Sequence, residues 1–277
     1  MKAAASPAPL ANISGPEQHQ PPAEKMPGHW LLASMGKRVL RPGGLELTRS
    51  LLDALAITAA DDVVEFAPGL GVTARMTLER NPRSYTAVER DCRAAAEVER
   101  LLLDRQRRRC VLGTAENTGL PDACATAVYG EAMLSMQADA ARKRIVAEAA
   151  RLLSTAGRYG IHELALVPDD IDEAIGVAIQ RDLSDEIHAG VRPLTVAEWR
   201  SLLETAGFRI DFERLAPMHL LEPLRLVRDE GVFGSLRFAW NVARHPAARQ
   251  RVRAMRRVFR KYRSHLTAVA LVGTKSA

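Results

Sequence analysis

Two glycines follow a short apolar run near residue 66 and could let a ligand approach the backbone closely. Gly69 and Gly71 come just after Val63–Phe66, a run that predicts a buried strand. In an open α/β sheet, ligands bind beyond the carboxyl ends of the strands, where glycine has no β-carbon to block the approach. Glu89 ends the next expected strand, twenty positions after Gly69, and a carboxylate there can accept hydrogen bonds from both hydroxyls of a ribose. This spacing predicts a nucleotide-cofactor loop.

Two cofactors compete for such a loop. The pattern Gly69-x-Gly71-x-x-Ala74 fits the dinucleotide fingerprint, in which the last glycine can be alanine. However, Glu65 lies inside the strand that feeds the loop, four residues before Gly69, where a dinucleotide-binding strand is usually apolar. An acidic side chain at this place suits a cationic ligand such as S-adenosylmethionine, which carries an amino acid and a sulfonium. We therefore expect S-adenosylmethionine, and an NAD(P)-dependent oxidoreductase is the alternative.

The rest of the chain alternates short apolar runs with helical patterns. Such alternation predicts parallel βαβ units, and right-handed crossovers make them a doubly wound, Rossmann-like α/β sheet with helices on both faces. The expected strands span residues 63–66, 84–89, 110–113, 126–129, 157–163, 208–215 and 266–272. The expected helices span residues 45–55, 72–78, 93–106, 139–153 and 195–207.

The chain departs from this alternation in two places. Residues 1–25 carry five prolines and almost no large apolar side chains, so we expect a disordered tail followed by a single domain at 26–277. Residues of helical character from about 217 to 264 separate the last two strands and form a C-terminal insertion that is too long for a simple connection. Because the insertion is rich in apolar residues, our hypothesis is that it caps an apolar acceptor pocket.

Several motifs occur in a fixed order along the chain. They are Glu-Phe-Ala-Pro-Gly-Leu-Gly at 65–71, Tyr-Thr-Ala-Val-Glu-Arg-Asp at 85–91 and Gly-Thr-Ala-Glu at 113–116, followed by the segments 151–158 and 193–208. Together they resemble the motifs of class I S-adenosylmethionine-dependent methyltransferases. Within that family the chain is similar to the small-molecule branch that includes ubiquinone- and arsenite-type enzymes.

The resemblance implies a fold, a cofactor and a set of binding residues. The fold would be a seven-stranded sheet, mostly parallel with an antiparallel last strand, and the cofactor S-adenosylmethionine, released as S-adenosylhomocysteine. Glu89 would bind the ribose, and the loop at 113–116 would surround the adenine. Ala67 and Thr114 depart from the family pattern, which leaves a catalytically silent adenosine-binding protein as a further alternative. The cofactor-binding residues are then Glu65, Ala67, Gly69, Gly71, Glu89, Arg90, Thr114, Ala115, Glu116 and Gly130.

Candidates for the chemistry lie near the strand ends. Methyl transfer from a sulfonium is an in-line displacement that needs alignment, and it needs a base only where the nucleophile must lose a proton. Glu131 follows the fourth strand and His162 closes the fifth, so both are candidates for touching the substrate or acting as a base. His29 and Trp30 precede the core, where the family has an active-site lid, and are candidate substrate residues. The alternative reading is structural: polar residues at the sheet edge, and a packed aromatic pair.

The net charge and its distribution along the chain limit the classes of binding partner. The chain has 277 residues, a net charge of +6 and a pI of about 9.5, which favours anionic partners without choosing among them. Eight arginines and lysines lie between residues 249 and 263 without an acid, but apolar residues recur there at helical spacing. We therefore expect a solvated helix face rather than a nucleic-acid site, and a peripheral membrane contact stays open. No apolar run reaches the ~20 residues that span a bilayer.

The cysteines give no sign of a metal site. Cys92, Cys110 and Cys124 have no Cys-x-x-Cys spacing, so we expect reduced thiols, no metal and a cytoplasmic protein. Arsenite as the methyl acceptor would need converging thiolates, which these positions do not predict.

Overall fold

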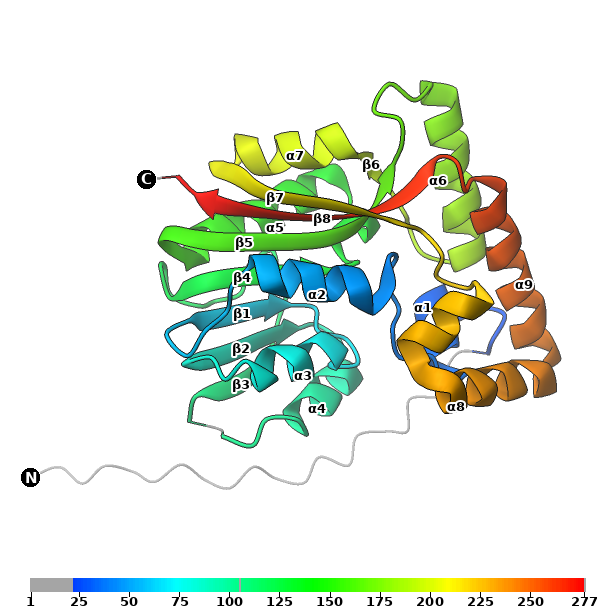
Figure 1. Ribbon diagram of the computed structural model, residues 1–277, viewed down its shortest axis with the longest axis horizontal. Helices are drawn as coiled ribbons and strands as arrows, with labels where there is room; N and C mark the ends of the chain where they lie inside the picture. Colours follow the sequence, from blue (N-terminus) through cyan, green and yellow to red (C-terminus); the bar gives the residue numbers. More distant parts are fainter. Residues whose placement is uncertain (1–21, 105, 277) are drawn as a thin grey trace, which may run out of the picture.

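One mixed sheet organises the chain (Figure 1). The computed structural model describes residues 22–104 and 106–276. Within them the strands are β1 (Asp62–Phe66), β2 (Ser84–Glu89), β3 (Arg108–Leu112), β4 (Ala125–Glu131), β5 (Leu153–Leu166), β6 (Leu194–Thr195), β7 (Phe208–Pro217) and β8 (Leu266–Lys275). They lie in the order β3-β2-β1-β4-β5-β8-β7, and β6 pairs with β5. Strands β1 to β5 pair in parallel, whereas β8 runs antiparallel to β5 and β7. The predicted doubly wound sheet with an antiparallel last strand is confirmed, and the short β6 adds an eighth strand.

Helices cover both faces of the sheet because successive side chains of a strand point to opposite sides. On one face, Val64 and Phe66 of β1 belong to the same apolar cluster as residues of α5 (Asp139–Leu152) and α7 (Val196–Thr205). On the other face, Val63 shares a cluster with residues of α2 (Gly44–Ala54), α3 (Val72–Glu79) and α4 (Cys92–Glu99). Trp199 of α7 is fully buried, and its indole N–H donates to the Leu164 carbonyl oxygen over 3.1 Å. The sheet is therefore sandwiched between two helical layers.

The helix expected at 93–106 is shorter in the structure than the sequence predicts. It ends at Glu99, and the backbone N–H groups of Leu101 and Leu102 then bond to carbonyl oxygens only three residues earlier. Leu102 is buried, whereas Leu103 points into solvent. The chain reverses here because β3 must run parallel to β2, so the helical pattern is cut short by the sheet.

Four helices gather beyond the carboxyl ends of the parallel strands, at the right in Figure 1. They are α1 (Gly28–Ser34), α6 (Glu173–Ile187), α8 (Pro223–Arg244) and α9 (Pro246–Lys261). They share one apolar cluster, here called the helical cap, which includes Leu31, Leu183, Phe238 and Met255. The insertion predicted at about 217–264 holds α8 and α9. Of the tail predicted at 1–25, residues 1–21 lie outside the described residues, while Ala23 accepts a hydrogen bond of 2.9 Å from Arg251 of α9.

A connecting segment links the helical cap to the sheet. Residues 35–43, here called the strap, run from α1 to α2. Glu230 of α8 accepts the backbone N–H groups of Arg38 and Val39 over 2.9 and 2.8 Å, and it pairs with the fully buried Lys37 over 3.5 Å. Next to it, the Asp229 carboxylate accepts the Leu45 N–H at the start of α2 over 3.0 Å. Two adjacent acids of α8 therefore hold the strap and the start of α2 in place.

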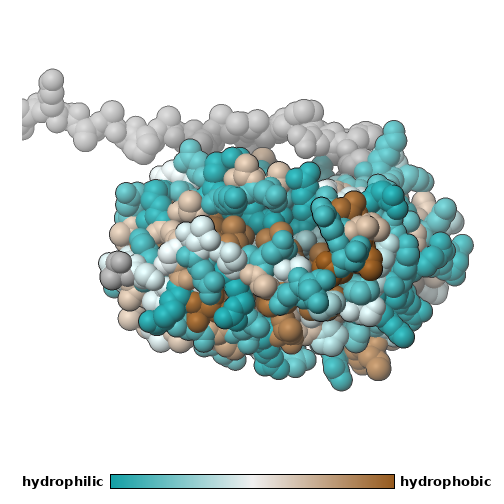
Figure 2. Space-filling view, turned by 90° about the horizontal axis from the view of Figure 1, so that it is seen from above, coloured by the Kyte–Doolittle hydropathy of each residue, from teal (hydrophilic) through white to brown (hydrophobic). Residues whose placement is uncertain are grey.

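The face of the molecule seen from above is mostly hydrophilic. Figure 2, which views the molecule from above, shows teal side chains over most of this face and smaller brown patches between them, one of them over the part that holds α6. Among the described residues, no helix is long and apolar enough to cross a membrane.

Candidate active site

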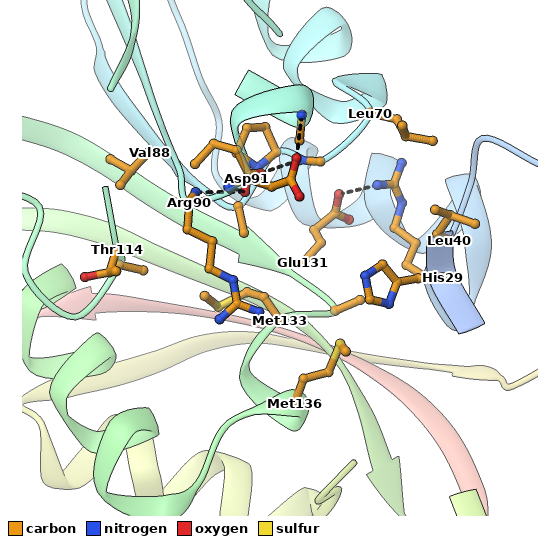
Figure 3. Close-up of a pocket in the computed structure, with 18 of the residues that line it drawn as sticks. His29, Leu40, Leu70, Val88, Arg90, Asp91, Thr114, Glu131, Met133 and Met136 are labelled. Atoms are coloured by element: carbon orange, nitrogen blue, oxygen red, sulfur yellow. Dashed lines mark hydrogen bonds and ion pairs between the residues drawn. The ribbon is translucent and has the colours of Figure 1, made fainter. Parts of the chain in front are cut away.

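A cavity of about 300 Å³ opens at the carboxyl ends of β1, β2 and β4 (Figure 3). The strand order reverses between β1 and β4, which is where ligands bind in doubly wound sheets. Seven of the predicted cofactor residues line it: Ala67, Gly69, Glu89, Arg90, Thr114, Ala115 and Glu116. Three of the predicted substrate residues line it as well: His29, Trp30 and Glu131. The predicted residues that do not line it are Glu65, Gly71, Gly130 and His162.

The two glycines of the loop after β1 have different surroundings. Both have left-handed backbones, with φ of 56° at Gly69 and 70° at Gly71. A β-carbon on Gly69 would meet no atom within 4 Å, so this backbone is open to the cavity. A β-carbon on Gly71 would lie 2.6 Å from the Leu101 side chain, so that glycine lets α3 pack beside the end of α4. Gly69 is thus the point of close approach for a ligand. Gly130 packs against Phe66 and the Met133 side chain, where a β-carbon would have contacts of 3.4 Å.

Glu89 joins the ends of β1 and β2. Its carboxylate accepts the Gly69 N–H over 3.0 Å, and it also accepts the N–H groups of Arg90 and Asp91 over 2.9 and 3.0 Å. An ionised carboxylate offers about four acceptor positions, so these three bonds leave capacity for a ligand hydroxyl. Asp91 in turn caps α4 by accepting the N–H groups of Arg93 and Ala94. The local sequence therefore fixes this carboxylate at the cavity wall.

The cavity has two ends of different character. In Figure 3, Val88, Arg90 and Thr114 lie on one side, while Glu131, His29, Leu40 and Leu70 lie toward the other. Thr114 starts a tight turn that bridges to Asn117, and Glu116 is held by Arg144 at 2.7 Å. Met133 and Met136 line the space between and below the two ends, and they give it apolar, adaptable walls. An elongated ligand with a flat end and a charged end would fit this layout.

Glu131 is the centre of a buried polar cluster. Its side chain is 5% exposed, and it accepts hydrogen bonds from the hydroxyls of Thr48 and Thr73, the former over 2.7 Å. His162 Nδ1 lies 2.7 Å from Glu131 Oε1, and Arg41 Nη1 lies 3.0 Å from Oε2. Burial by itself would raise the pKa of Glu131, but the charge of Arg41 and the bond from His162 hold this pKa at about 2. Glu131 is therefore ionised at neutral pH and tied to four partners.

His162 lies behind Glu131 and outside the cavity. The two residues are register partners in the parallel pair β4–β5, so their side chains share one face of the sheet. The His162 ring is fully buried, and its Nε2 lies 2.5 Å from the carbonyl oxygen of Pro42. Both ring nitrogens of His162 therefore face acceptor oxygens, one of a carboxylate and one of a carbonyl. The predicted pair of Glu131 and His162 is brought together, but only Glu131 lines the cavity.

Arg41 was not among the predicted residues and is the main addition to the site. It lines the cavity from the strap, and its side chain is 11% exposed. Nη1 is used by Glu131, whereas Nε and Nη2 are buried and have no hydrogen-bond partner. The Arg41 guanidinium therefore carries more donors than Glu131 uses. This combination of free donors and positive charge suits an anionic group of a ligand.

His29 presents a second free polar atom at the same end of the cavity. Its Nδ1 is buried without a hydrogen-bond partner, and its ring packs on Trp30 with centroids 5.4 Å apart. Burial lowers the pKa of His29, and the charge of Arg90 lowers it further. The imidazole is therefore neutral at pH 7 and can accept a proton or a hydrogen bond. His29 and Trp30 therefore form the aromatic pair that was the structural alternative, and they also line the cavity as predicted for substrate residues.

The remaining predicted polar groups lie away from the cavity. Cys92, Cys110 and Cys124 are free thiols on α4, β3 and the segment before β4, and no group of three or more His, Cys, Asp or Glu side chains in the described part of the chain could hold a metal ion. Glu65 is buried beneath the sheet, where the hydroxyls of Tyr85 and Tyr129 donate to its Oε2 over 2.5 and 2.6 Å. Burial raises the pKa of Glu65 to about 7 against the effect of these two bonds.

Comparisons with known proteins fit this geometry. No family model matches the chain. An uncharacterised protein of Haemophilus influenzae is 29% identical over 247 residues, which cover 87% of this chain and 96% of that protein. The solved phosphoethanolamine N-methyltransferase 2 of Haemonchus contortus, in complex with phosphomonomethylethanolamine and S-adenosylhomocysteine, superposes with a TM-score of 0.68 at 12% identity, over 94% of this chain and 59% of that one.

Another solved structure shows that this fold is not restricted to methyl transfer. The [4+2]-cyclase SpnF superposes with a TM-score of 0.67 at 16% identity, over 89% of this chain and 92% of that one. Several further neighbours are methyltransferases. The chain therefore has the fold of the class I methyltransferases, and its chemistry must be argued from the site.

The buried Glu65 carboxyl predicts an unusual pH dependence of stability. Its ordinary pKa of 4.5 is raised to about 7 in the folded protein, so the folded state holds this proton more tightly than the unfolded chain. The resulting stabilisation is fully present below pH 4.5 and is lost as the pH rises through about 7. We expect the free energy of unfolding of the wild type, relative to Glu65→Gln, to fall by roughly 3 kcal/mol between pH 4.5 and pH 8 in urea titrations. The exposed Glu79→Gln should show no such difference, and a pH-independent difference for Glu65→Gln would contradict the assignment.

Proposed function

We propose that the protein is an S-adenosylmethionine-dependent methyltransferase that acts on a small-molecule acceptor. The observation that carries this proposal is the Glu89 carboxylate, fixed beside the open backbone of Gly69 at the reversal of strand order. A carboxylate at the end of β2 suits ribose hydroxyls, and a glycine at the end of β1 admits a ligand against the backbone. When bound, the cofactor supplies a methyl group that its sulfonium activates.

The two ends of the cavity fit the two ends of this cofactor. In the proposal, the loop at 113–116 and Val88 enclose the adenine, and Glu89 holds the ribose. Arg41 holds the carboxylate of the methionine part, because its guanidinium is positively charged and its Nε and Nη2 donors are buried without a partner. Glu65 does not line the cavity, so its role is to link β1 to the neighbouring strands through Tyr85 and Tyr129 rather than to bind the cofactor.

A nicotinamide dinucleotide is the less suitable ligand. A volume of about 300 Å³ is at the lower end of the range for small-molecule sites, which favours one nucleoside with a short tail. Arg41 and the strap also place a carboxylate-binding group at the end of the cavity that a second nucleotide would have to occupy.

The acceptor is assigned to the space between His29, Trp30 and Leu40 on one side and Met133 and Met136 on the other. Glu131 is a weak candidate for a base, because a pKa of about 2 leaves it little affinity for a proton at neutral pH. It is proposed instead to position Arg41. His29, neutral and with a free Nδ1, is the proposed proton acceptor for an acceptor molecule that loses a proton on methylation.

Cofactor binding can be measured directly by calorimetry. S-adenosylhomocysteine should bind to the wild type, and NAD(H) and NADP(H) should give no heat. Glu89→Gln removes a charged acceptor, which should weaken binding about 10- to 100-fold. Glu97→Gln, an exposed change on α4, is the matched control and should bind normally. If NAD(P)H bound in place of S-adenosylhomocysteine, the oxidoreductase reading would replace the proposal.

The role of His29 can be read from the pH dependence of turnover once an acceptor is known. Because the pKa of His29 is lowered from 6.5, wild-type kcat/KM should be constant above pH 6.5 and fall only as the pH drops through this lowered pKa. His29→Phe should reduce kcat about 100-fold, abolish this acid limb and leave the affinity for S-adenosylhomocysteine unchanged. The exposed His188→Phe serves as control. An acid limb that persists in His29→Phe would show that another group titrates.

A further inference from the structure

Positive charge is concentrated in one part of the molecule. Residues 223–263 contain twelve arginines and lysines against two acids, a net charge of +10, whereas the whole chain carries +6, so the remainder carries −4. The two acids are Asp229 and Glu230, whose carboxylates bind backbone N–H groups at the start of α2 and in the strap. From residue 231 to residue 277 the sequence contains no acid at all. The α8–α9 hairpin is therefore strongly basic and unlike the rest of the protein.

The same hairpin exposes a stripe of large apolar side chains. Phe233 is 89% exposed, and Leu236 and Trp240 are each 63% exposed. Their spacing of three and four residues puts them on one face of α8, opposite the buried Phe238. Val232 beside the stripe is 59% exposed, and Leu224 and Val227, which precede the break of α8 at Gly231, are 78 and 43% exposed.

Arginines border this stripe. Arg237 and Arg244 each stand four residues after a member of the stripe, and the Arg244 guanidinium lies over the Trp240 ring at 5.5 Å from its centroid. Arginine beside exposed Trp, Phe and Leu on an amphipathic helix is the composition of a helix that lies in the headgroup region of a bilayer. The basic charge complements anionic lipids.

We propose that α8 docks on the surface of an anionic lipid bilayer. Phe233, Leu236 and Trp240 enter the boundary between headgroups and acyl chains, while Arg237 and Arg244 contact lipid phosphates. A nucleic acid would match the charge but not the leucine at the centre of the stripe, because single-stranded binding relies on aromatic stacking. This inference rests on the exposed face of α8 and is independent of the chemistry proposed for the cavity.

The docking face is connected to the cavity wall through hydrogen bonds between α8 and the strap. Glu230 of α8 binds the backbone of Arg38 and Val39, and the strap that they belong to carries Arg41 and Leu40 into the cavity wall. The backbone of α8 breaks at Gly231 (φ 72°, ψ 172°), so the part that meets the lipid directly follows the part that holds one wall of the site. A molecule dissolved in or attached to the membrane would be presented beside that wall.

Sedimentation with lipid vesicles tests the proposal on the full chain. The wild type should bind vesicles of mixed phosphatidylcholine and phosphatidylglycerol, bind pure phosphatidylcholine far less, and lose affinity as salt rises. The double variant Phe233→Ser/Trp240→Ser should bind at least about tenfold more weakly. The matched control Leu103→Ser/Val177→Ser removes two side chains of nearly the same exposure, 88 and 60%, from other parts of the chain and should bind as the wild type does. Arg244→Gln should lose roughly fivefold.

Other outcomes would overturn the proposal. Absence of vesicle binding, or an equal loss in the two double variants, would exclude α8 as the docking helix. If Phe233→Ser/Trp240→Ser converted a dimer into a monomer in analytical ultracentrifugation while vesicle binding was absent, the face would join two copies of the chain. Tight, salt-sensitive binding of RNA that is lost in Arg244→Gln, without vesicle binding, would make the partner a nucleic acid.

Discussion

The buried negative charge of Glu131 is the constraint around which the site is built. Removing a carboxylate from water costs several kcal/mol unless hydrogen bonds and opposite charge compensate it. Here Thr48 of α2, Thr73 of α3, His162 of β5 and Arg41 of the strap all converge on it. Meeting that cost requires four separate segments to be in place together. The cluster therefore couples the sheet, two helices and the cavity wall.

The same cluster gives the cavity its electrostatic character. The Glu131 carboxylate is shared between the Arg41 guanidinium and the His162 ring, and Nε and Nη2 of Arg41 remain without a partner. At the other end, the Glu89 carboxylate accepts hydrogen bonds from three backbone N–H groups and can still accept one from a ligand hydroxyl. An anionic group at one end and hydroxyl donors at the other would complete both sets of interactions, which is the distribution that an adenosyl amino acid provides.

Much of the fold and part of the site follow from local sequence signals. The strand positions and the loop of Gly69 are predictable because apolar periodicity and glycine position are local properties, and Glu89 follows from its distance to that loop. The Glu131–His162 contact is not predictable in this way, because it depends on the register between two strands about thirty residues apart. Arg41 was not predicted because it lies in the strap, and the position of the strap depends on hydrogen bonds to Glu230 of α8, far along the chain. The Arg-Pro-Gly-Gly run at 41–44, just before the first expected helix, is the one local signal that could have drawn attention to it.

Other differences have the same origin. Glu65 was predicted to bind the cofactor, but its buried carboxyl group accepts hydrogen bonds from Tyr85 and Tyr129 on the neighbouring strands instead. The insertion at 217–264 contributes no side chain to the cavity wall among the described residues, and instead α8 supports the strap that does. Long-range pairing thus decides which polar residues face the cavity.

Because a cyclase shares this fold, binding of the cofactor alone would not establish methyl transfer. The most direct measurement is turnover of S-adenosylmethionine carrying a labelled methyl group in the presence of a metabolite extract. The account predicts that the label moves to a small molecule and that Arg41→Ala, which removes the free donors, slows this transfer strongly. Cofactor that binds in the cavity while its label stays in place with every fraction of the extract would contradict the account.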